Sequence, residues 1–338
     1  MYFANVIRQR LLLLFLVVLG VSAVTFAISH VIPGDPAQLM AGDRASKETV
    51  EAIRRTLGLD QPLWVQYGTY LSHLVQGDLG MSIRTQRPVA EDILLFFPAT
   101  LELALISLIL AVLVGVPLGI ASAVAKDSFI DHVCRSLSVV GVSTPAFWLG
   151  LVVIYVFYGK LGWFPGSGRI SANVTAPALV TGFYTVDALI SGNWAAFRSA
   201  VSHLVLPAFT LGFLTVGIVA RQIRSAMLEV LQEDYIRTAR ASGLSRRRII
   251  LDHALRNALI PSVTVLGLTF GELLYGSVLI ETVFALPGMG SYVVQSIAAL
   301  DFPAIMGFTV VVSAVYVLVN LLVDLTYLVL DPQTRKAG

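Results

Sequence analysis

Six long apolar stretches constrain the fold of this chain more than any other feature of its sequence. Each is long enough to cross the hydrocarbon core of a bilayer, which takes about 20 helical residues. Because unpaired backbone groups are not tolerated in lipid, we interpret each stretch as a transmembrane helix. The sequence therefore predicts an all-α polytopic membrane protein. Its expected spans are residues 11–32, 100–125, 137–158, 204–220, 259–284 and 305–330.

The composition agrees with this prediction. Hydrophobic residues make up 56% of the 338 residues and charged residues only 13%, whereas a soluble chain needs nearly twice that charged fraction to cover its surface. The first span follows Arg8 and Arg10 as a secretory signal would, but its length favours a retained anchor. Cys134 is the one cysteine, which excludes an internal disulfide and a cysteine-rich metal site, and we expect it to pack as a small apolar residue.

Lysine and arginine in the short connections predict the orientation of the chain. If the N-terminus is cytoplasmic, the segments on that side carry 14 of the 23 basic residues, and segment 285–304 on the other side carries none. The positive-inside rule then places both ends of the chain in the cytoplasm. The expected division is a cytoplasmic segment 1–10, a first span 11–32, an extracytoplasmic loop 33–99, a core 100–330 with the other five spans, and a cytoplasmic tail 331–338.

The extracytoplasmic loop contains two predicted helices. One covers residues 46–57, with Ser46 as its N-cap and Gly58 just past its end, and aligns Val50, Ile53 and Leu57. The second starts at Pro62 and aligns Leu63, Tyr67, Tyr70, Leu71 and Leu74 on one face. These helices either pack over the spans as a small cap, which we favour, or receive a soluble protein on the outer side.

The long polar stretch at residues 221–258, here called the basic loop, carries eight arginines. Glu233 or Asp234 can cap a helix that runs to Ser242, Gly243 can supply the left-handed residue that ends it, and Ser245 can start the next helix. A loop that only fixes topology and meets anionic lipid would explain the arginines but not this order. We therefore interpret the basic loop as a rigid knob that docks a partner in the cytoplasm.

The chain lacks the sequence patterns of several chemistries. It has no phosphate-binding loop, since Gly159-Lys160 is followed by Leu161, and no zinc helix of the H-E-x-x-H type. It also lacks a serine elbow, because Ser167 follows Phe164-Pro165-Gly166. The five histidines lie far apart without ligand spacing: His30, His73, His132, His203 and His253. We expect no nucleotide, metal or hydrolytic site in this chain.

The basic loop resembles the cytoplasmic signature of permease subunits of ATP-binding cassette importers. Gly243 stands at the signature glycine and Ala239 at the second alanine, while Arg237 and Thr238 replace the preceding Glu and Ala. The replacements match the variant of the peptide/nickel branch, which reads Arg-Thr-Ala-x-Ala-x-Gly-Leu and then His-Ala-Leu-Arg-Asn-Ala. The second part stands at residues 253–258.

Further motifs of that branch follow in order along the chain. They are Ile32-Pro33-Gly34-Asp35-Pro36, Gly77-Asp78-Leu79-Gly80-x-Ser82, Pro88-Val89, Pro98-Ala99-Thr100-Leu101-Glu102-Leu103, Pro145-x-Phe147-Trp148, Thr181-Gly182-Phe183, Glu281-Thr282-Val283-Phe284, Pro287-Gly288-x-Gly290 and Asp331-Pro332. Each is weak alone. Together, in order over about 330 residues, they strengthen the resemblance to this branch. The length, the extended outer loop and the Thr181-Gly182-Phe183 stretch look most like the inner-membrane dipeptide permease subunit of Gram-negative bacteria.

The resemblance implies a fold and a set of partners. The fold is that of a type I importer permease in the bacterial inner membrane. A related second permease would complete a heterodimer that forms the peptide pathway, an extracytoplasmic binding protein would deliver the peptide, and two ATPase subunits would bind ATP and Mg²⁺. This chain would be non-catalytic, bind no cofactor or metal and contact lipid but no nucleic acid. The residues expected to couple it to the ATPases are Asp234, Tyr235, Arg237, Thr238, Ala239, Arg240, Gly243, Leu244, His253, Arg256 and Asn257.

Three acids fall within the predicted spans, where carboxylates are costly and often functional. Glu272 could meet the ammonium group of a passing peptide or bond a neighbouring helix. Glu281, with Pro287 and Gly288, is a candidate for the pathway or its gate, and Asp324 for a structural contact. A proton-driven secondary transporter would instead use Glu272 and Asp324 as a relay. An intramembrane enzyme lacks a nucleophile–base pair.

The sequence leaves the substrate open. Importers of this branch also carry nickel chelates, glutathione and opine-like compounds, and the binding protein makes most of that choice.

Overall fold

The computed structural model describes residues 2–31, 35–42, 44–56 and 58–330. Over these residues the protein is all-helical, and its one β-bridge joins Met81 to Pro88. Some predicted motif and loop residues lie outside the described residues: Ile32, Pro33, Gly34, Leu57, Asp331, Pro332, Arg335 and Lys336.

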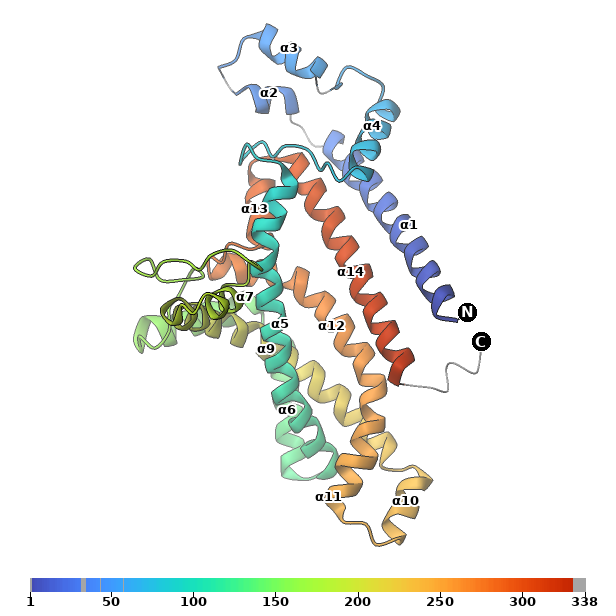
Figure 1. Cartoon of the computed structure of the whole chain (residues 1–338). Helices are drawn as coiled ribbons and strands as arrows, with labels where there is room; N and C mark the ends of the chain where they lie inside the picture. Colours follow the sequence, from blue (N-terminus) through green and yellow to red (C-terminus); the bar gives the residue numbers. More distant parts are fainter. Residues whose placement is uncertain (1, 32–34, 43, 57, 331–338) are drawn as a thin grey trace.

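Five helices are long and apolar enough to cross a membrane. They are α1 (Tyr2–Val31), α5 (Val89–Val124), α9 (Trp194–Val230), α12 (Arg256–Val283) and α14 (Phe302–Leu330). Each contains most of one predicted span. α5 extends beyond its predicted span by residues 89–99, and α9 extends beyond its predicted span at both ends. α1 and α14 lie side by side at the edge of the bundle (Figure 1).

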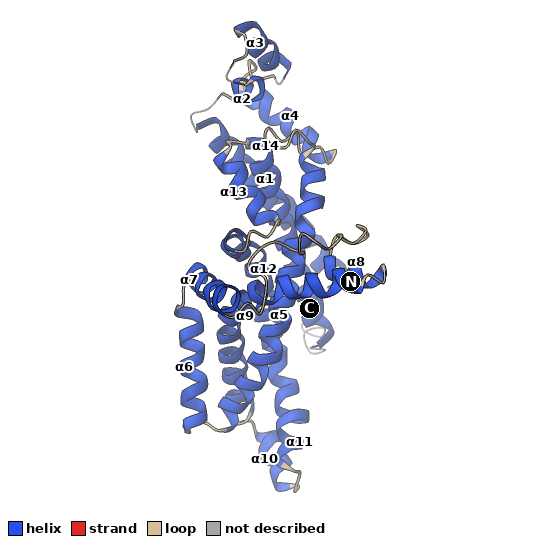
Figure 2. Cartoon of the chain, turned by 90° about the vertical axis from the view of Figure 1, so that its left-hand side faces the viewer, coloured by secondary structure: helices blue, strands red, loops and turns tan. Residues whose placement is uncertain are grey.

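The third predicted span, 137–158, is not one continuous helix. It is split into α6 (Phe129–Ser143), α7 (Ala146–Val153) and the π-helix η1 (Ile154–Lys160), with a bend of 101° between α6 and the α7–η1 pair (Figure 2). The break falls at Thr144, whose backbone is extended with φ −80° and ψ 125°. The following Pro145 disfavours a helical conformation at Thr144 and cannot donate a backbone hydrogen bond. The prediction of a single third helix was therefore wrong.

α5 and α9 pack against each other over a long contact, and glycines allow the close approach. Gly115 and Gly119 form a G-x-x-x-G pattern on α5, and small residues of this kind let two membrane helices pack backbone to backbone. A Cβ atom on Gly119 would stand 2.7 Å from the Ala220 carbonyl oxygen and 2.7 Å from Ile223 Cβ. Neither contact is possible for real atoms, so only glycine fits at this crossing.

We expect Gly119→Leu to separate α5 from α9. The overpacking should lower the free energy of unfolding by about 3 kcal/mol or more, because the neighbour includes backbone that cannot move aside. Thermal unfolding of the purified subunit measures the effect. Gly20→Leu on α1 is the matched control, since a Cβ atom there meets nothing within 4 Å. Equal losses in both variants would contradict the packing argument.

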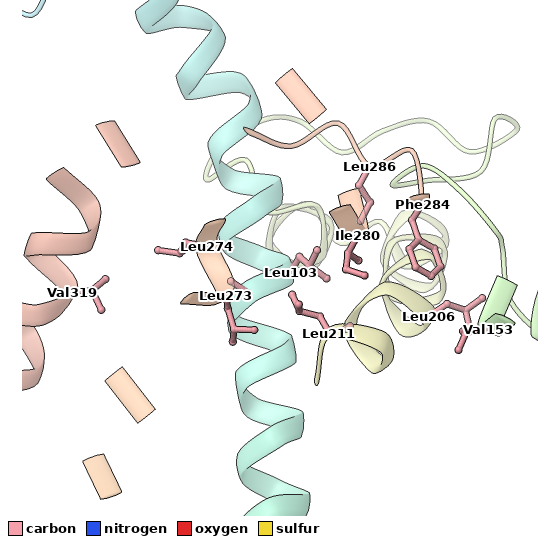
Figure 3. Close-up of a cluster of buried hydrophobic side chains, with 12 residues drawn as sticks. Leu103, Val153, Leu206, Leu211, Leu273, Leu274, Ile280, Phe284, Leu286 and Val319 are labelled. Atoms are coloured by element: carbon pink, nitrogen blue, oxygen red, sulfur yellow. The ribbon is translucent and has the colours of Figure 1, made fainter. Parts of the chain in front are cut away.

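A hydrophobic core joins the helices where they cross. Its buried side chains come from α5, α7, α9, α12, α14 and the turn after α12, and include Leu103, Val153, Leu206, Leu211, Leu273, Ile280, Phe284 and Val319 (Figure 3). Burial of apolar area holds these elements together.

Three short helices form a group at one end of the bundle, here called the cap (Figure 1). They are α2 (Pro36–Ala41), α3 (Lys47–Thr56) and α4 (Leu63–Val75), so both predicted helices are confirmed. Ser46 Oγ accepts a hydrogen bond from Thr49 N at 3.2 Å, which is the predicted N-cap. The cap docks on α1 through Tyr67, whose hydroxyl lies 3.0 Å from Ser22 Oγ. The remaining helices are α8 (Tyr184–Ile190), α10 (Asp234–Ala241), α11 (Arg246–Arg248), the π-helix η2 (Ile249–Leu255) and α13 (Met289–Ala298).

Candidate functional site

The basic loop lies at the end of the bundle opposite the cap (Figure 1). α10 follows α9 after a turn, and α11 leads through η2 directly into α12. The predicted order of helix, glycine and helix is therefore present. The predicted capping is not: Glu233 occupies the N-cap position of α10 and Ser245 that of α11, but neither side chain makes a capping hydrogen bond.

Gly243 ends α10 in a Schellman motif. Its backbone is left-handed, with φ +77°. The amide of Leu244 donates to the Ala239 carbonyl at 3.3 Å, and the amide of Gly243 donates to the Arg240 carbonyl at 3.1 Å. These are the two bonds that define the motif. Leu244 packs against the same apolar cluster as Ala239, so the turn between α10 and α11 has a fixed geometry.

The inner face of the basic loop is anchored in the bundle. Ile236 of α10 and Ala254 of η2 are fully buried, in one cluster with Ile223 and Met227 of α9 and with Ala123 of α5. Displacement of α10 must therefore move the ends of α5 and α9 with it, because a close-packed interior transmits strain.

The outer face of the basic loop is open. Asp234, Arg237, Thr238, Arg240 and Gly243 are exposed, and the ion pair between Asp234 and Arg237 at 3.0 Å contributes little to stability at this exposure. Beside this face is a hollow of about 650 Å³, and its lining includes Arg248, Asp252, His253 and Arg256. Asn257 donates to the Tyr235 hydroxyl at 3.0 Å and joins α12 to α10. Most of the predicted coupling residues thus lie on the open side of the basic loop, whereas Ala239 and Leu244 pack into the apolar cluster beneath it.

One arginine of the basic loop has a different role. Arg224 lies within α9 and donates to both carboxylate oxygens of Asp131, at 2.8 Å each. Asp131 is fully buried in α6 and also accepts from Ser122 of α5 at 2.5 Å. This cluster ties three helices together. Arg224 is one of the eight arginines of the basic loop by its place in the sequence, but its charge is already paired inside the bundle.

At the cap end of the bundle, Glu281 is buried at the centre of a hydrogen-bond network. One carboxylate oxygen accepts from Thr100 of α5 at 2.7 Å and from Ser277 at 2.8 Å, and the other accepts from the Ser291 amide of α13 at 3.1 Å. A Cβ atom on Gly290 would lie 2.9 Å from that second oxygen. The glycine pattern after α12 thus lets the chain fold back over the carboxylate. Glu281 and Pro287 also line a pocket of about 240 Å³.

A second buried pair fixes the long loop between η1 and α9. Arg169 donates to Glu102 of α5 at 2.8 Å and stacks on the Tyr184 ring at 3.7 Å. Nearby, Asp187 accepts hydrogen bonds from the backbone amides of residues 180–182. Burial would raise the pKa of Asp187, but these bonds and the Thr181 hydroxyl outweigh it and hold the pKa below its ordinary value of 3.8. Sequence reasoning missed this pair, since Arg169 stands in no motif.

The other two predicted acids lie apart. Asp324 of α14 forms an ion pair with Arg10 of α1 at 2.5 Å, and each side chain is about one-third exposed. Glu272 of α12 is exposed and has no ion-pair partner among the described residues. Among the described residues, no group of three or more His, Cys, Asp or Glu side chains is placed to hold a metal ion.

Comparison with known proteins places the chain in a family. The profile of binding-protein-dependent transport system inner membrane components matches residues 115–336, and that of the N-terminal part of such components matches residues 3–104. The chain belongs to this family. It is the inner-membrane permease subunit of an ATP-binding cassette importer, and ATP hydrolysis is the task of other subunits.

Relatives of this permease match over nearly its whole length. It is 62% identical to the probable D,D-dipeptide transport system permease protein of Escherichia coli K12, over 100% of this chain and 99% of the relative. It is 43% identical to the dipeptide transport system permease protein of the same organism, over 97% of this chain and 98% of the relative. It is 40% identical to the glutathione transport system permease protein of Salmonella choleraesuis, over 98% of this chain and 99% of the relative.

A solved structure supports the fold. A chain of the MetNI methionine ABC transporter in an inward-facing conformation aligns with this permease at a TM-score of 0.50. The alignment covers 69% of this chain and 93% of that chain, at 17% identity. Together with the family match, this confirms the predicted type I importer fold.

Proposed function

We propose that this permease forms one half of a membrane pathway that imports dipeptides or short oligopeptides. The observation that carries the proposal is the 62% identity, over the full chain, to a protein named for D,D-dipeptide transport. Other relatives at 43–44% identity are named for dipeptide transport. A second permease would complete the pathway, and an extracytoplasmic binding protein would deliver the peptide.

The basic loop is the proposed contact with the ATPase subunits, which bind ATP and Mg²⁺. With both termini in the cytoplasm, as the basic residues favour, this loop is cytoplasmic and the cap extracytoplasmic. Closure of the ATPase dimer on ATP would draw the two basic loops of the permease pair together. Because Ile236 and Ala254 are buried against α9, that movement would pass to the ends of α9 and α5 and reorient the pathway.

The alternative functions have different support. A glutathione importer is favoured by the 40% identical relative, while nickel chelates and opine-like compounds rest on the sequence resemblance alone. A proton relay through Glu272 and Asp324 is disfavoured, since Asp324 is already paired with Arg10.

The test is the ATPase activity of the purified complex in nanodiscs, with its binding protein empty or loaded. We would load an L,L-dipeptide, a D,D-dipeptide or glutathione. Stimulation by either dipeptide, with no response to glutathione, is the expected result. Stimulation by glutathione alone would reject the proposed substrate, and a complex that purifies without an ATPase subunit would reject the proposed mechanism.

A further inference from the structure

One face of α12 is open along the whole helix. Its exposed residues recur at helical spacing and therefore lie on one side. We call this row the α12 stripe: Asn257, Pro261, Thr264, Leu268, Glu272, Tyr275, Leu279 and Thr282. The intervening residues Leu273, Ile280 and Glu281 are buried. Packing against α5, α9 and α14 thus uses the rest of α12 and leaves the stripe free.

The α12 stripe connects the hollow beside the basic loop with the pocket beside Glu281. At the basic loop, its first residues adjoin the hollow lined by His253, Arg256 and Leu259. At the cap end, its last residue, Thr282, is part of the lining of the pocket beside Glu281. A continuous open surface therefore runs from one end of the membrane helix to the other.

The composition of the stripe does not suit lipid. The exposed side chains of α1 show what a lipid-facing surface of this protein contains, for example Leu12, Phe15 and Val24. The α12 stripe instead carries five polar residues among its eight. Glu272 lies near the middle of the helix, where a carboxylate that faces hydrocarbon is strongly disfavoured. The stripe must therefore face an aqueous passage or another protein surface.

The surroundings of Glu272 fit a cation. Tyr275 is on the same face one turn away and is 50% exposed. Tyr316 of α14 packs against Gly271, where a Cβ atom would lie 2.8 Å from its ring carbons, and is 36% exposed. A carboxylate with accessible aromatic rings nearby can bind an ammonium group through both an ion pair and cation–π contacts.

We propose that the α12 stripe lines the transport passage and that Glu272, Tyr275 and Tyr316 bind the amino-terminal ammonium group of a passing peptide. This inference rests on the proposed function and adds the site in the membrane that recognises the peptide's positive end. The negative charge of Glu272 would also exclude anionic solutes from the passage.

The test compares wild type, Glu272→Gln and Glu272→Asp in proteoliposomes that contain the whole complex and its binding protein. The measured quantity is the number of dipeptides imported per ATP hydrolysed. We expect Glu272→Gln to lower this ratio about tenfold, with unchanged stimulation of the ATPase, because a charge-assisted bond is lost. Glu272→Asp keeps the negative charge and should retain most of the wild-type ratio of dipeptides imported per ATP. Glu91→Gln, an exposed acid at the start of α5, is the control and should match wild type.

Three outcomes would overturn the proposal. An unchanged ratio in Glu272→Gln would remove Glu272 from the passage. Loss of the second permease from the purified Glu272→Gln complex would show that the carboxylate pairs with that subunit instead. Absence of any ATPase response to loaded binding protein in the wild type would reject the proposed function itself, before any variant is compared.

Discussion

Replacing Gly243 with valine is expected to impair coupled transport strongly. Gly243 has φ +77°, a conformation that costs an ordinary residue about 1–2 kcal/mol and a β-branched residue more. Valine would therefore shift the backbone out of the Schellman turn and change the angle between α10 and α11. We expect peptide uptake to fall at least about tenfold, because a strain of about 1.4 kcal/mol corresponds to a tenfold lower population of the native turn. Uptake and ATPase activity in proteoliposomes measure the effect.

Gly243→Asn separates backbone conformation from side-chain size. A Cβ atom at this position meets nothing within 4 Å, so steric exclusion does not explain the glycine. Asparagine adopts the left-handed conformation more readily than valine, and we expect it to retain most of the transport. If asparagine and valine were equally inactive, the fixed turn would not be the reason for the loss. Normal uptake by Gly243→Val would reject a coupling role for the turn.

The second large effect is expected from Asp131→Asn. The substitution leaves Arg224 with its charge uncompensated among α5, α6 and α9, and such a loss from a buried pair costs about 3 kcal/mol. Breaking a buried ion pair usually costs about 3–5 kcal/mol, and we expect the lower value here because the Arg224 side chain is 21% exposed. The purified subunit should show a lower unfolding temperature, and the complex should assemble poorly.

Two further variants test the cause of this loss. Asp252→Asn removes an acid whose pair with Arg248 is 3.8 Å long and exposed, so its effect should stay below about 1 kcal/mol. The double variant Asp131→Leu with Arg224→Met replaces the pair by apolar side chains and should recover much of the stability. A double variant as unstable as Asp131→Asn would show that the unpaired charge is not the cause.

Local patterns of the sequence predicted the helices well. Five spans follow from hydropathy because lipid leaves the backbone no other hydrogen-bond partners. The turn at Gly243 follows from the preference of glycine for the left-handed region. The break at Thr144, before Pro145, was not predicted, and the other prolines show why a proline is a weak signal: Pro98, Pro117, Pro207 and Pro261 stand inside continuous helices. Proline alone therefore does not identify where a membrane helix ends.

The buried ionic contacts could not be predicted in the same way. Asp131 pairs with Arg224 and Glu102 with Arg169, in each case between elements far apart in the sequence. Thr100 and Glu281 are likewise separated by 181 residues, although both stand in recognised motifs. A motif shows which residues matter to the family, but only the packing of the helices shows which of them meet. The α12 stripe could not be predicted either. Apolar and polar residues are mixed along α12, so only the packing of the other helices shows which face stays exposed.

The central claim is that the basic loop receives the ATPase subunit, and site-specific cross-linking tests it most directly. In a Cys134→Ala background, Thr238→Cys presents one thiol on the exposed side of α10. We expect a short bifunctional reagent to link this thiol to an ATPase subunit in the assembled complex and to block peptide-stimulated ATPase activity. A thiol introduced at Thr69 of α4 should give no such link. Failure of Thr238→Cys to cross-link while the ATPase co-purifies, or its labelling by a membrane-impermeant reagent from outside the cell, would contradict the account.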